Sequence, residues 1–290
     1  MPNLQNFLSL VKFSHTIFAL PFAIIGFFLA THHPDFGYEF EWYKLLLVLL
    51  CMVFARSAAM AFNRYVDRDI DLKNPRTATV REIPRGAVSP KSALGFVILN
   101  SVLFVVTTYF INPLCFFLSP VALAVVLGYS YTKRFTALCH FVLGLGLALA
   151  PVGAFVAVTA KFELLPIVFG LVVLFWVSGF DIIYALQDES FDKAEKLHSI
   201  PTYLGKKNAL RLSSVLHLIC AGLLVVAGFV GGMGMVYWGA TVVFIGLLFY
   251  QHTLVTPNDL SRVNLAFFTT NGVASVLFGA GVLVELLVMV

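Results

Sequence analysis

The sequence predicts an all-α, polytopic membrane protein with nine transmembrane helices in one bundle. Of its 290 residues, 60% are hydrophobic and only 12% are charged, whereas soluble domains carry about 25% charged residues. So few charges cannot cover a folded surface in water, and the apolar excess must therefore face lipid. The apolar segments are also long and uniform, which favours membrane helices over the alternating strands of a barrel.

Nine apolar runs define the helices, because each approaches the roughly 20 residues that span a bilayer. The first run is assigned to a helix rather than to a signal peptide, since eight more follow it. Two charged segments, 63–92 and 185–209, interrupt the series. No soluble domain separates the other runs, so one transmembrane domain is expected over residues 1–290. In order, the predicted helices are residues 13–31, 43–62, 93–111, 114–131, 138–159, 163–184, 210–230, 234–251 and 266–288.

Lysine and arginine residues predict how this bundle is oriented. In the nine-helix arrangement only Lys44 and Lys161 fall on one side, and Arg56 lies inside the second helix. Because basic residues concentrate in cytoplasmic loops, we expect the amino terminus in the cytoplasm and the carboxyl terminus outside. No basic stripe with interleaved aromatic residues is present, so no nucleic-acid partner is expected. The bases on the cytoplasmic side are Lys12, Arg64, Arg68, Lys73, Arg76, Arg81, Arg85, Lys91, Lys133, Arg134, Lys193, Lys196, Lys206, Lys207, Arg211 and Arg262.

An asparagine and two aspartates follow the second helix with helical spacing. Asn63, Asp67 and Asp71 are four residues apart, which places them on one face of a continued helix because each residue turns by about 100°. Asp69 points away from that face. One amide and two carboxylates suit Mg²⁺ that is held jointly with substrate phosphates. All three residues are therefore candidate metal ligands, and the two aspartates are candidate catalytic residues.

A second acidic group lies at the end of the sixth helix. On a continuous helix Asp181, Asp188 and Asp192 fall within about 40° of one another, and Tyr184 flanks them as a candidate substrate-binding residue. Asp181 lies inside an apolar run, where a charge costs about 2.5–3.5 kcal/mol and needs a partner or a metal. Either segment alone is typical of a solvated helix end. Two such segments with matching phase on one membrane side favour a shared catalytic metal site.

Basic residues near both acidic groups are candidates for binding a phosphate. Arg76 follows the first group, and Tyr129, Lys133 and Arg134 end the fourth helix, with Tyr129 and Lys133 one turn apart. Arginine offers a fork that matches phosphate or carboxylate, and lysine offers a mobile point charge. Anchoring of the helix end at the membrane surface is the alternative role for Lys133 and Arg134.

One arginine lies within the membrane part of the second helix. Arg56 precedes Asn63 by seven residues and lies within about 20° of the same face. It is a candidate for holding a substrate carboxylate, and pairing with Asp181 is the alternative. A secondary transporter also uses ionisable groups inside the membrane. Transport predicts such groups near the middle of the bilayer, whereas most of these lie at one end.

These motifs resemble those of the UbiA superfamily of intramembrane prenyltransferases. The first aspartate-rich motif of the family, Asn-x3-Asp-x3-Asp, is matched by Asn63, Asp67 and Asp71. The aspartates of the sixth helix resemble the second motif, and Tyr129 and Lys133 resemble its Tyr-x3-Lys element. The resemblance covers nearly the whole chain and is greatest to the bacterial branch that serves quinone biosynthesis.

The resemblance implies an enzyme of the cell inner membrane with a UbiA-like fold. It implies transfer of a polyprenyl group from polyprenyl diphosphate to a 4-hydroxybenzoate-type aromatic acid, as in ubiquinone biosynthesis, with Mg²⁺ ions held by both motifs. Prenylation of a naphthoate in menaquinone biosynthesis is the alternative, because residues 197–201 (LHSIP) resemble the futalosine branch.

Overall fold

The structure is a computed structural model that describes residues 4–11 and 17–289. Apart from one isolated β-bridge between Thr256 and Asp259, its regular elements are helices, which confirms the predicted all-α class. The elements are α1 (Leu4–Leu10), α2 (Leu20–His32), α3 (Trp42–Val66), α4 (Arg68–Lys73), α5 (Pro75–Ala78), α6 (Pro90–Ile111), α7 (Pro113–Thr132), α8 (Cys139–Thr159), α9 (Leu164–Ala185), the 3₁₀-helix η2 (Leu186–Asp188), α10 (Glu189–Ala194), α11 (Ile200–Val230), α12 (Met235–Thr253), the π-helix η3 (Leu265–Thr270) and α13 (Asn271–Val288).

The described residues come close to the predicted nine membrane-spanning helices without confirming that number. In the described part of the chain, eight helices are long and apolar enough to cross a membrane, and α2 is a ninth, shorter apolar helix. Its 13 residues extend about 20 Å at 1.5 Å per residue, against a hydrocarbon core of about 30 Å.

The predicted helix 13–31 corresponds to α2, which begins at Leu20. Residues 13–16 lie outside the described residues, and residues 17–19 precede the first turn of α2. Pro21 lies in that first turn. Backbone N–H groups there have no partner within the helix, so the missing N–H of proline costs no hydrogen bond. Within the described residues, the apolar run therefore starts at least three residues before α2 does, because hydropathy does not record where the first helical turn closes.

The seventh predicted helix, 210–230, begins ten residues earlier than expected, at Ile200. Ser199 and Thr202 form a reciprocal capping box at its start, and Pro201 lies in its first turn. Gly205 has φ 73° and ψ 163°, so the helix bends there, as glycine permits. Hydropathy missed the polar first turns because they lie beyond the apolar run.

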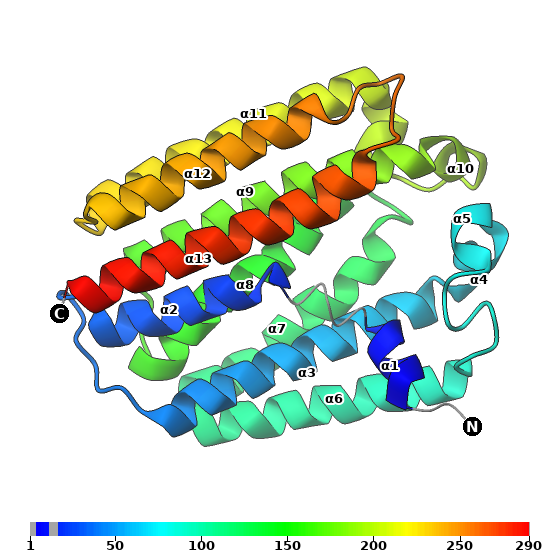
Figure 1. Ribbon diagram of the computed structural model, residues 1–290. Coiled ribbons are helices and arrows are strands. Elements are labelled where there is room, and N and C mark those ends of the chain that lie inside the picture. The colour runs from blue at the N-terminus through cyan, green and yellow to red at the C-terminus, as the bar shows by residue number, and fades with distance from the viewer. Residues whose placement is uncertain (1–3, 12–16, 290) are drawn as a thin grey trace.

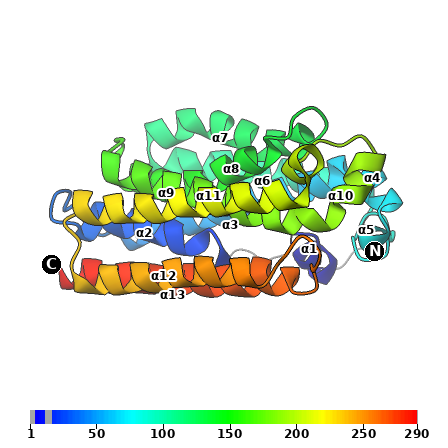
Figure 2. The ribbon, with the colours of Figure 1, turned by 90° about the horizontal axis from the view of Figure 1, so that it is seen from above.

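The long helices run side by side in one bundle, as Figure 1 shows, with α4, α5 and α10 at the same end as the amino terminus. The carboxyl terminus lies at the opposite end. Seen from above in Figure 2, α12 and α13 line one side and α7 the other, with α9 and α11 between them. The most extensive packing joins α8 to α9, α9 to α11 and α3 to α6.

Buried aromatic rings and close helix contacts hold the bundle together. The Trp176 ring of α9 is fully buried, with its centroid 5.4 Å from that of Phe22 in α2 and 5.5 Å from that of Phe244 in α12. Where α2 crosses α8, a side chain on Gly26 would collide with the backbone of Pro151. Small residues permit such close approach between membrane helices.

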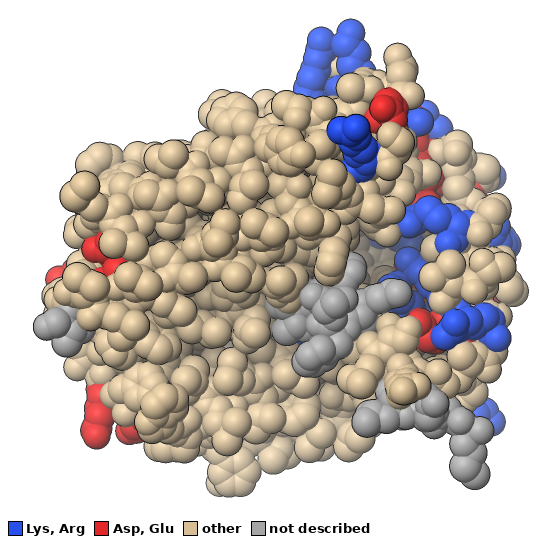
Figure 3. All heavy atoms as spheres, viewed as in Figure 1, with Lys and Arg blue, Asp and Glu red and all other residues tan. Residues whose placement is uncertain are grey.

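Charge and apolar surface are separated on the outside of the molecule. Figure 3 shows the Lys and Arg atoms gathered at the end where α4, α5 and α10 lie, with an uncharged flank along the bundle. Large apolar side chains of the long helices are exposed, among them Trp42 at 77% and Phe229 at 75%. We call the end formed by residues 63–89, 129–140 and 181–199 the charged end. It contains both predicted acidic groups.

Candidate active site at the charged end of the bundle

Asp67 is the most buried carboxylate of the first acidic group, and it lies directly after the last residue of α3. It is 1% exposed, and Asn63 Nδ2 donates a hydrogen bond of 3.1 Å to its Oδ2. Two cations from the end of α7 approach the same carboxylate, Lys133 Nζ at 2.7 Å and Arg134 Nη1 at 3.0 Å. The structure thus brings four predicted site residues together around one buried negative charge.

Asp71 lies one turn later and is also buried, at 3% exposure. The helix is interrupted at Asp67, yet the Asp71 N–H still donates to the Asp67 carbonyl at 2.8 Å. The two carboxylates therefore keep nearly the helical relationship that their spacing predicts. Arg81 forms an ion pair with the Asp71 carboxylate, and Thr77 Oγ1 donates to the Asp71 carbonyl at 2.9 Å.

The segment after the first group reaches over to the second. Arg76 donates from Nε to Asp188 Oδ1 at 2.9 Å and also forms an ion pair through Nη2. Its Nη1 donates to the Tyr184 hydroxyl at 3.0 Å, and Asn74 Nδ2 donates to Asp188 at 3.1 Å. Burial disfavours the charged guanidinium, but the hydrogen bonds to Asp188 outweigh this and raise the pKa of Arg76.

The continuous helix assumed for the second group is interrupted between its aspartates. Helix α9 ends at Ala185 and the 3₁₀-helix η2 ends at Asp188. A 3₁₀-helix turns about 120° per residue instead of about 100°, so three residues rotate the later aspartates by roughly 60° relative to Asp181. Asp192 is half-buried and lies within electrostatic range of Asp188 and Lys133.

Asp181 has a partner that the sequence analysis did not identify. His140 Nδ1, at the start of α8, lies 2.7 Å from Asp181 Oδ2. The histidine is 3% exposed. Its position 41 residues before Asp181, at the edge of an apolar run, gave no spacing signal. The alternative pairing of Asp181 with Arg56 is not found among the described ion pairs.

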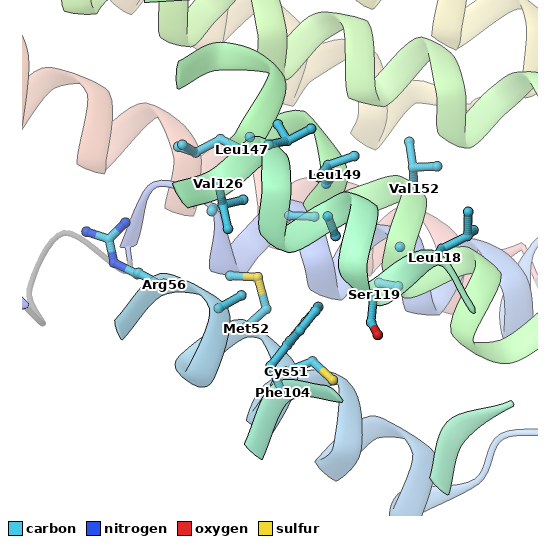
Figure 4. Close-up of a pocket in the computed structure, with 18 of the residues that line it drawn as sticks. Cys51, Met52, Arg56, Phe104, Leu118, Ser119, Val126, Leu147, Leu149 and Val152 are labelled. Carbon is cyan, nitrogen blue, oxygen red and sulfur yellow. The ribbon is translucent and has the colours of Figure 1, made fainter. Parts of the chain in front are cut away.

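A largely apolar cavity of about 350 Å³ lies beside this cluster, between α3, α6, α7 and α8. Figure 4 shows Arg56 at one end of the cavity, with apolar side chains such as Met52, Phe104 and Leu147 along its length. Arg56 Nε is buried and has no hydrogen-bond partner in the described structure. Tyr129 also lines the cavity. It lies within electrostatic range of Asp67 and Asp181, and so connects the cavity to both acidic groups.

The oxygen donors at the charged end are chemically suited to a magnesium ion, which prefers carboxylate and amide oxygens. Asp67 Oδ1 is buried without a hydrogen-bond donor, although Arg134 approaches it as an ion pair. Asn63 Oδ1, in contrast, accepts a bond of 3.1 Å from the buried Arg64. Across residues 4–11 and 17–289, no three His, Cys, Asp or Glu side chains converge as they would on a metal. The six predicted ligands therefore share one end of the bundle without forming a closed cage.

Comparison with known proteins matches this chain to one family along most of its length. The model of the UbiA prenyltransferase family matches residues 19–273. A 4-hydroxybenzoate octaprenyltransferase of Nitrosomonas eutropha is 30% identical over 244 residues, which cover 84% of each chain. A protein of the same name from Saccharophagus degradans is 30% identical over 249 residues, covering 86% of this chain and 82% of the relative.

Two solved structures have the same architecture. The apo structure of a UbiA homolog from Aeropyrum pernix K1 is 32% identical, with a TM-score of 0.84 over 93% of this chain and 98% of the other. A UbiA homolog from Archaeoglobus fulgidus bound to GPP and Mg²⁺ is 21% identical, with a TM-score of 0.72 over 97% and 99% of the two chains. At that identity the second likeness concerns the fold alone.

Proposed function

The chain belongs to the UbiA prenyltransferase family, and on this premise we propose that it transfers a polyprenyl group from polyprenyl diphosphate to 4-hydroxybenzoate. The names of the relatives in Nitrosomonas eutropha and Saccharophagus degradans support this acceptor. The whole chain acts as a single domain in the cell inner membrane, with its charged end in the cytoplasm. The observation that carries the choice of an aromatic acid is Arg56 in the apolar cavity, whose buried Nε has no hydrogen-bond partner among the described residues.

Arg56 binds the carboxylate of the acceptor. A charge in the membrane interior costs about 2.5–3.5 kcal/mol, and Arg56 forms no ion pair with the described residues, so a ligand that supplies a negative charge would stabilise it. Its guanidinium forms two parallel hydrogen bonds with a carboxylate. The side chains beside it, including Met52 and Leu147, are apolar. The aromatic ring of the ligand packs against them.

The donor diphosphate lies at the charged end, and its isoprenoid tail extends into the apolar cavity. Lys133, Arg134, Arg76 and Arg81 are the cations within reach of the acidic groups. Their charge balances the diphosphate oxygens. When bound, Mg²⁺ held among Asn63, Asp67, Asp71, Asp181, Asp188 and Asp192 supplies further positive charge to the leaving diphosphate. The Mg²⁺ and GPP bound to the Archaeoglobus fulgidus homolog support a divalent metal in this role.

The reaction breaks the allylic carbon–oxygen bond of the donor, and the electron pair leaves with the diphosphate. Lys133 and Arg134 stabilise that departing charge. The allylic cation forms at the end of the cavity, where few polar groups admit water, so it is protected from hydrolysis. A ring carbon of the acceptor, oriented by Arg56, then forms the new carbon–carbon bond. The ring carbon then loses its proton to an oxygen of the released diphosphate, which restores aromaticity.

The naphthoate alternative is kept because its acceptor carries the same carboxylate that Arg56 would bind, and the LHSIP segment favours it. That segment leads into α11, where Ile200 contacts His140, and so it lies beside the charged end. A secondary transporter would carry ionisable groups through the middle of the bundle. The ion pairs of this site instead gather at one end.

The test is a prenyl-transfer assay with purified protein, Mg²⁺ and a polyprenyl diphosphate. The acceptors are 4-hydroxybenzoate, 4-hydroxybenzyl alcohol as its counterpart without a carboxylate, and a dihydroxynaphthoate, and products are identified by mass. We expect the carboxylate to be required and Arg56→Gln to lower kcat/KM about 10- to 150-fold, corresponding to 1.5–3 kcal/mol for a charge-assisted bond. Arg56→Lys is the matched control that retains the charge.

Each outcome of this assay discriminates between the proposals. Absence of product with every acceptor would overturn the proposed activity. Product with the naphthoate alone would replace 4-hydroxybenzoate as the acceptor. Equal loss of activity toward the acid and the alcohol in Arg56→Gln would remove Arg56 from the acceptor site.

A further inference from the structure

His140 lies outside both aspartate-rich motifs, yet it connects two segments of the charged end. It is 3% exposed, in the first turn of α8. Its Nδ1 lies 2.7 Å from Asp181 Oδ2 on α9, and its Nε2 lies 3.3 Å from the backbone nitrogen of Ile200 at the start of α11. Both ring nitrogens therefore have a partner on a different helix.

The two partners determine which ring nitrogen carries the hydrogen. The Ile200 N–H can only donate, so His140 Nε2 accepts. In a neutral imidazole the other nitrogen is then the donor, and Nδ1–H donates to the Asp181 carboxylate. One tautomer satisfies both bonds, so the ring fixes the direction from which Asp181 receives a hydrogen bond and leaves the second carboxylate oxygen for another ligand.

We propose that His140 is a positioning residue that orients the Asp181 carboxylate toward the metal and ties that orientation to docking of the first turn of α11. This proposal rests on the proposed function only in placing Asp181 among the metal-binding residues. Hydrogen bonds to carboxylate ligands from surrounding side chains orient the ligands, and their loss weakens metal binding about 10- to 100-fold.

The helices that carry this pair are closely packed, so the pair is held in place. A side chain on Gly144 of α8 would lie 2.6 Å from the Leu174 carbonyl and from Ser178 Oγ of α9. Ser178 Oγ also donates to the His140 carbonyl at 3.2 Å. The backbone of α8 near His140 is thus bound to the turn of α9 that precedes Asp181, and the imidazole has little freedom to follow a displaced carboxylate.

The segment before α11 links the same histidine to the first acidic group. The His198 N–H donates to the Lys133 carbonyl at 2.7 Å, two residues before Ile200. Lys133 Nζ lies 2.7 Å from Asp67. Residues 198–200 therefore contact both Lys133, which pairs with Asp67, and His140, which pairs with Asp181. If the first turn of α11 moved away, His140 Nε2 would lose the hydrogen bond from the Ile200 N–H. The carboxylates of Asp67 and Asp181 would then both be held less firmly.

Three variants separate the two hydrogen bonds of His140. In His140→Asn the amide replaces Nδ1 and still donates to Asp181. In His140→Gln the longer amide replaces Nε2 and serves only Ile200, and in His140→Phe both bonds are lost with similar ring size. His198→Gln is the matched control, because that side chain is exposed at the same end of the bundle.

The primary measurement is Mn²⁺ binding to the full-length protein by electron paramagnetic resonance, with an unreactive prenyl thiolodiphosphate present. We expect His140→Phe and His140→Gln to weaken Mn²⁺ binding about 10- to 100-fold, while His140→Asn and His198→Gln stay within about threefold of the unchanged protein. The second measurement is kinetic. The Mg²⁺ concentration for half-maximal transfer rises by the same factor, and the KM for the aromatic acid, which Arg56 binds, does not change.

Equal Mn²⁺ binding by His140→Asn and His140→Gln would overturn the proposal, and this comparison holds even if His140→Phe fails to fold. Wild-type Mn²⁺ affinity in His140→Phe would overturn it as well. The proposed function can fail without this proposal. If the protein transfers no prenyl group to any acceptor, the proposed activity is wrong. If Mn²⁺ binding is then still weakened in His140→Gln and not in His140→Asn, the positioning role of His140 stands.

Discussion

Replacement of Asp67 by asparagine removes the negative charge that Lys133 and Arg134 share, while the side chain keeps its size. Asp67 is 1% exposed, and the two cations are 28% and 31% exposed. Breaking a fully buried pair costs about 3–5 kcal/mol. Because both cations regain water in the variant, we expect about 2 kcal/mol, which lowers the melting temperature by about 3 °C for a chain of this size. Transfer activity should fall about 100-fold or more, since the site also loses a candidate metal ligand.

The assays are thermal unfolding in detergent and steady-state transfer at saturating Mg²⁺. Asp69→Asn is the control, because Asp69 lies two residues away on α4 with its side chain 80% exposed. It should change neither the melting temperature nor kcat/KM. Near-normal activity in Asp67→Asn, with the expected loss of stability, would show that Asp67 stabilises the helix end without serving the reaction. An unchanged melting temperature would refute the assigned ion-pair energy.

Three further outcomes are expected. Lys133→Ala should lower kcat/KM about 10- to 150-fold if its charge serves the diphosphate, whereas unchanged kinetics would return it to a membrane-anchoring role. Glu285 accepts hydrogen bonds from the backbone of Gly234 and Tyr237 at the start of α12, so Glu285→Ala should destabilise the protein by about 1–2 kcal/mol without altering kcat/KM, and intact thermal stability would contradict this capping role. Single cysteines at Asp35 and Arg85, in a background without native cysteines, should be labelled from opposite sides of the membrane, and labelling of both from outside would refute the orientation.

The helical architecture was predictable from sequence because hydropathy records which residues face lipid. The helix ends were less predictable, because they depend on backbone hydrogen bonding. Pro21 sets the start of α2 inside its apolar run, and the capping box of Ser199 starts α11 before its apolar run. Both differences arise where a local turn, rather than a change in polarity, fixes the boundary.

The grouping of the acidic residues at one end of the bundle was predictable because helical spacing places them together and because a carboxylate inside an apolar run, such as Asp181, is rare. Their partners were harder to predict, since these come from distant parts of the chain. Asn74 contacts Asp188, 114 residues later, and His140 contacts Asp181 from another helix. Only the packing of α8 on α9, and of the segment after α4 on η2, brings these residues together.

The distribution of charge along the bundle explains how one molecule meets two opposing demands. Binding a diphosphate needs many charges, and these lie at the end of the bundle where partial exposure lowers the cost of their burial. Protecting an allylic cation needs a dry space, and the cavity beside them is lined mostly by apolar side chains. Arg56 is the exception, because it places a charge inside that space. We propose that its cost in the substrate-free protein is recovered when a carboxylate binds, so that the residue that destabilises the cavity also selects an acidic acceptor.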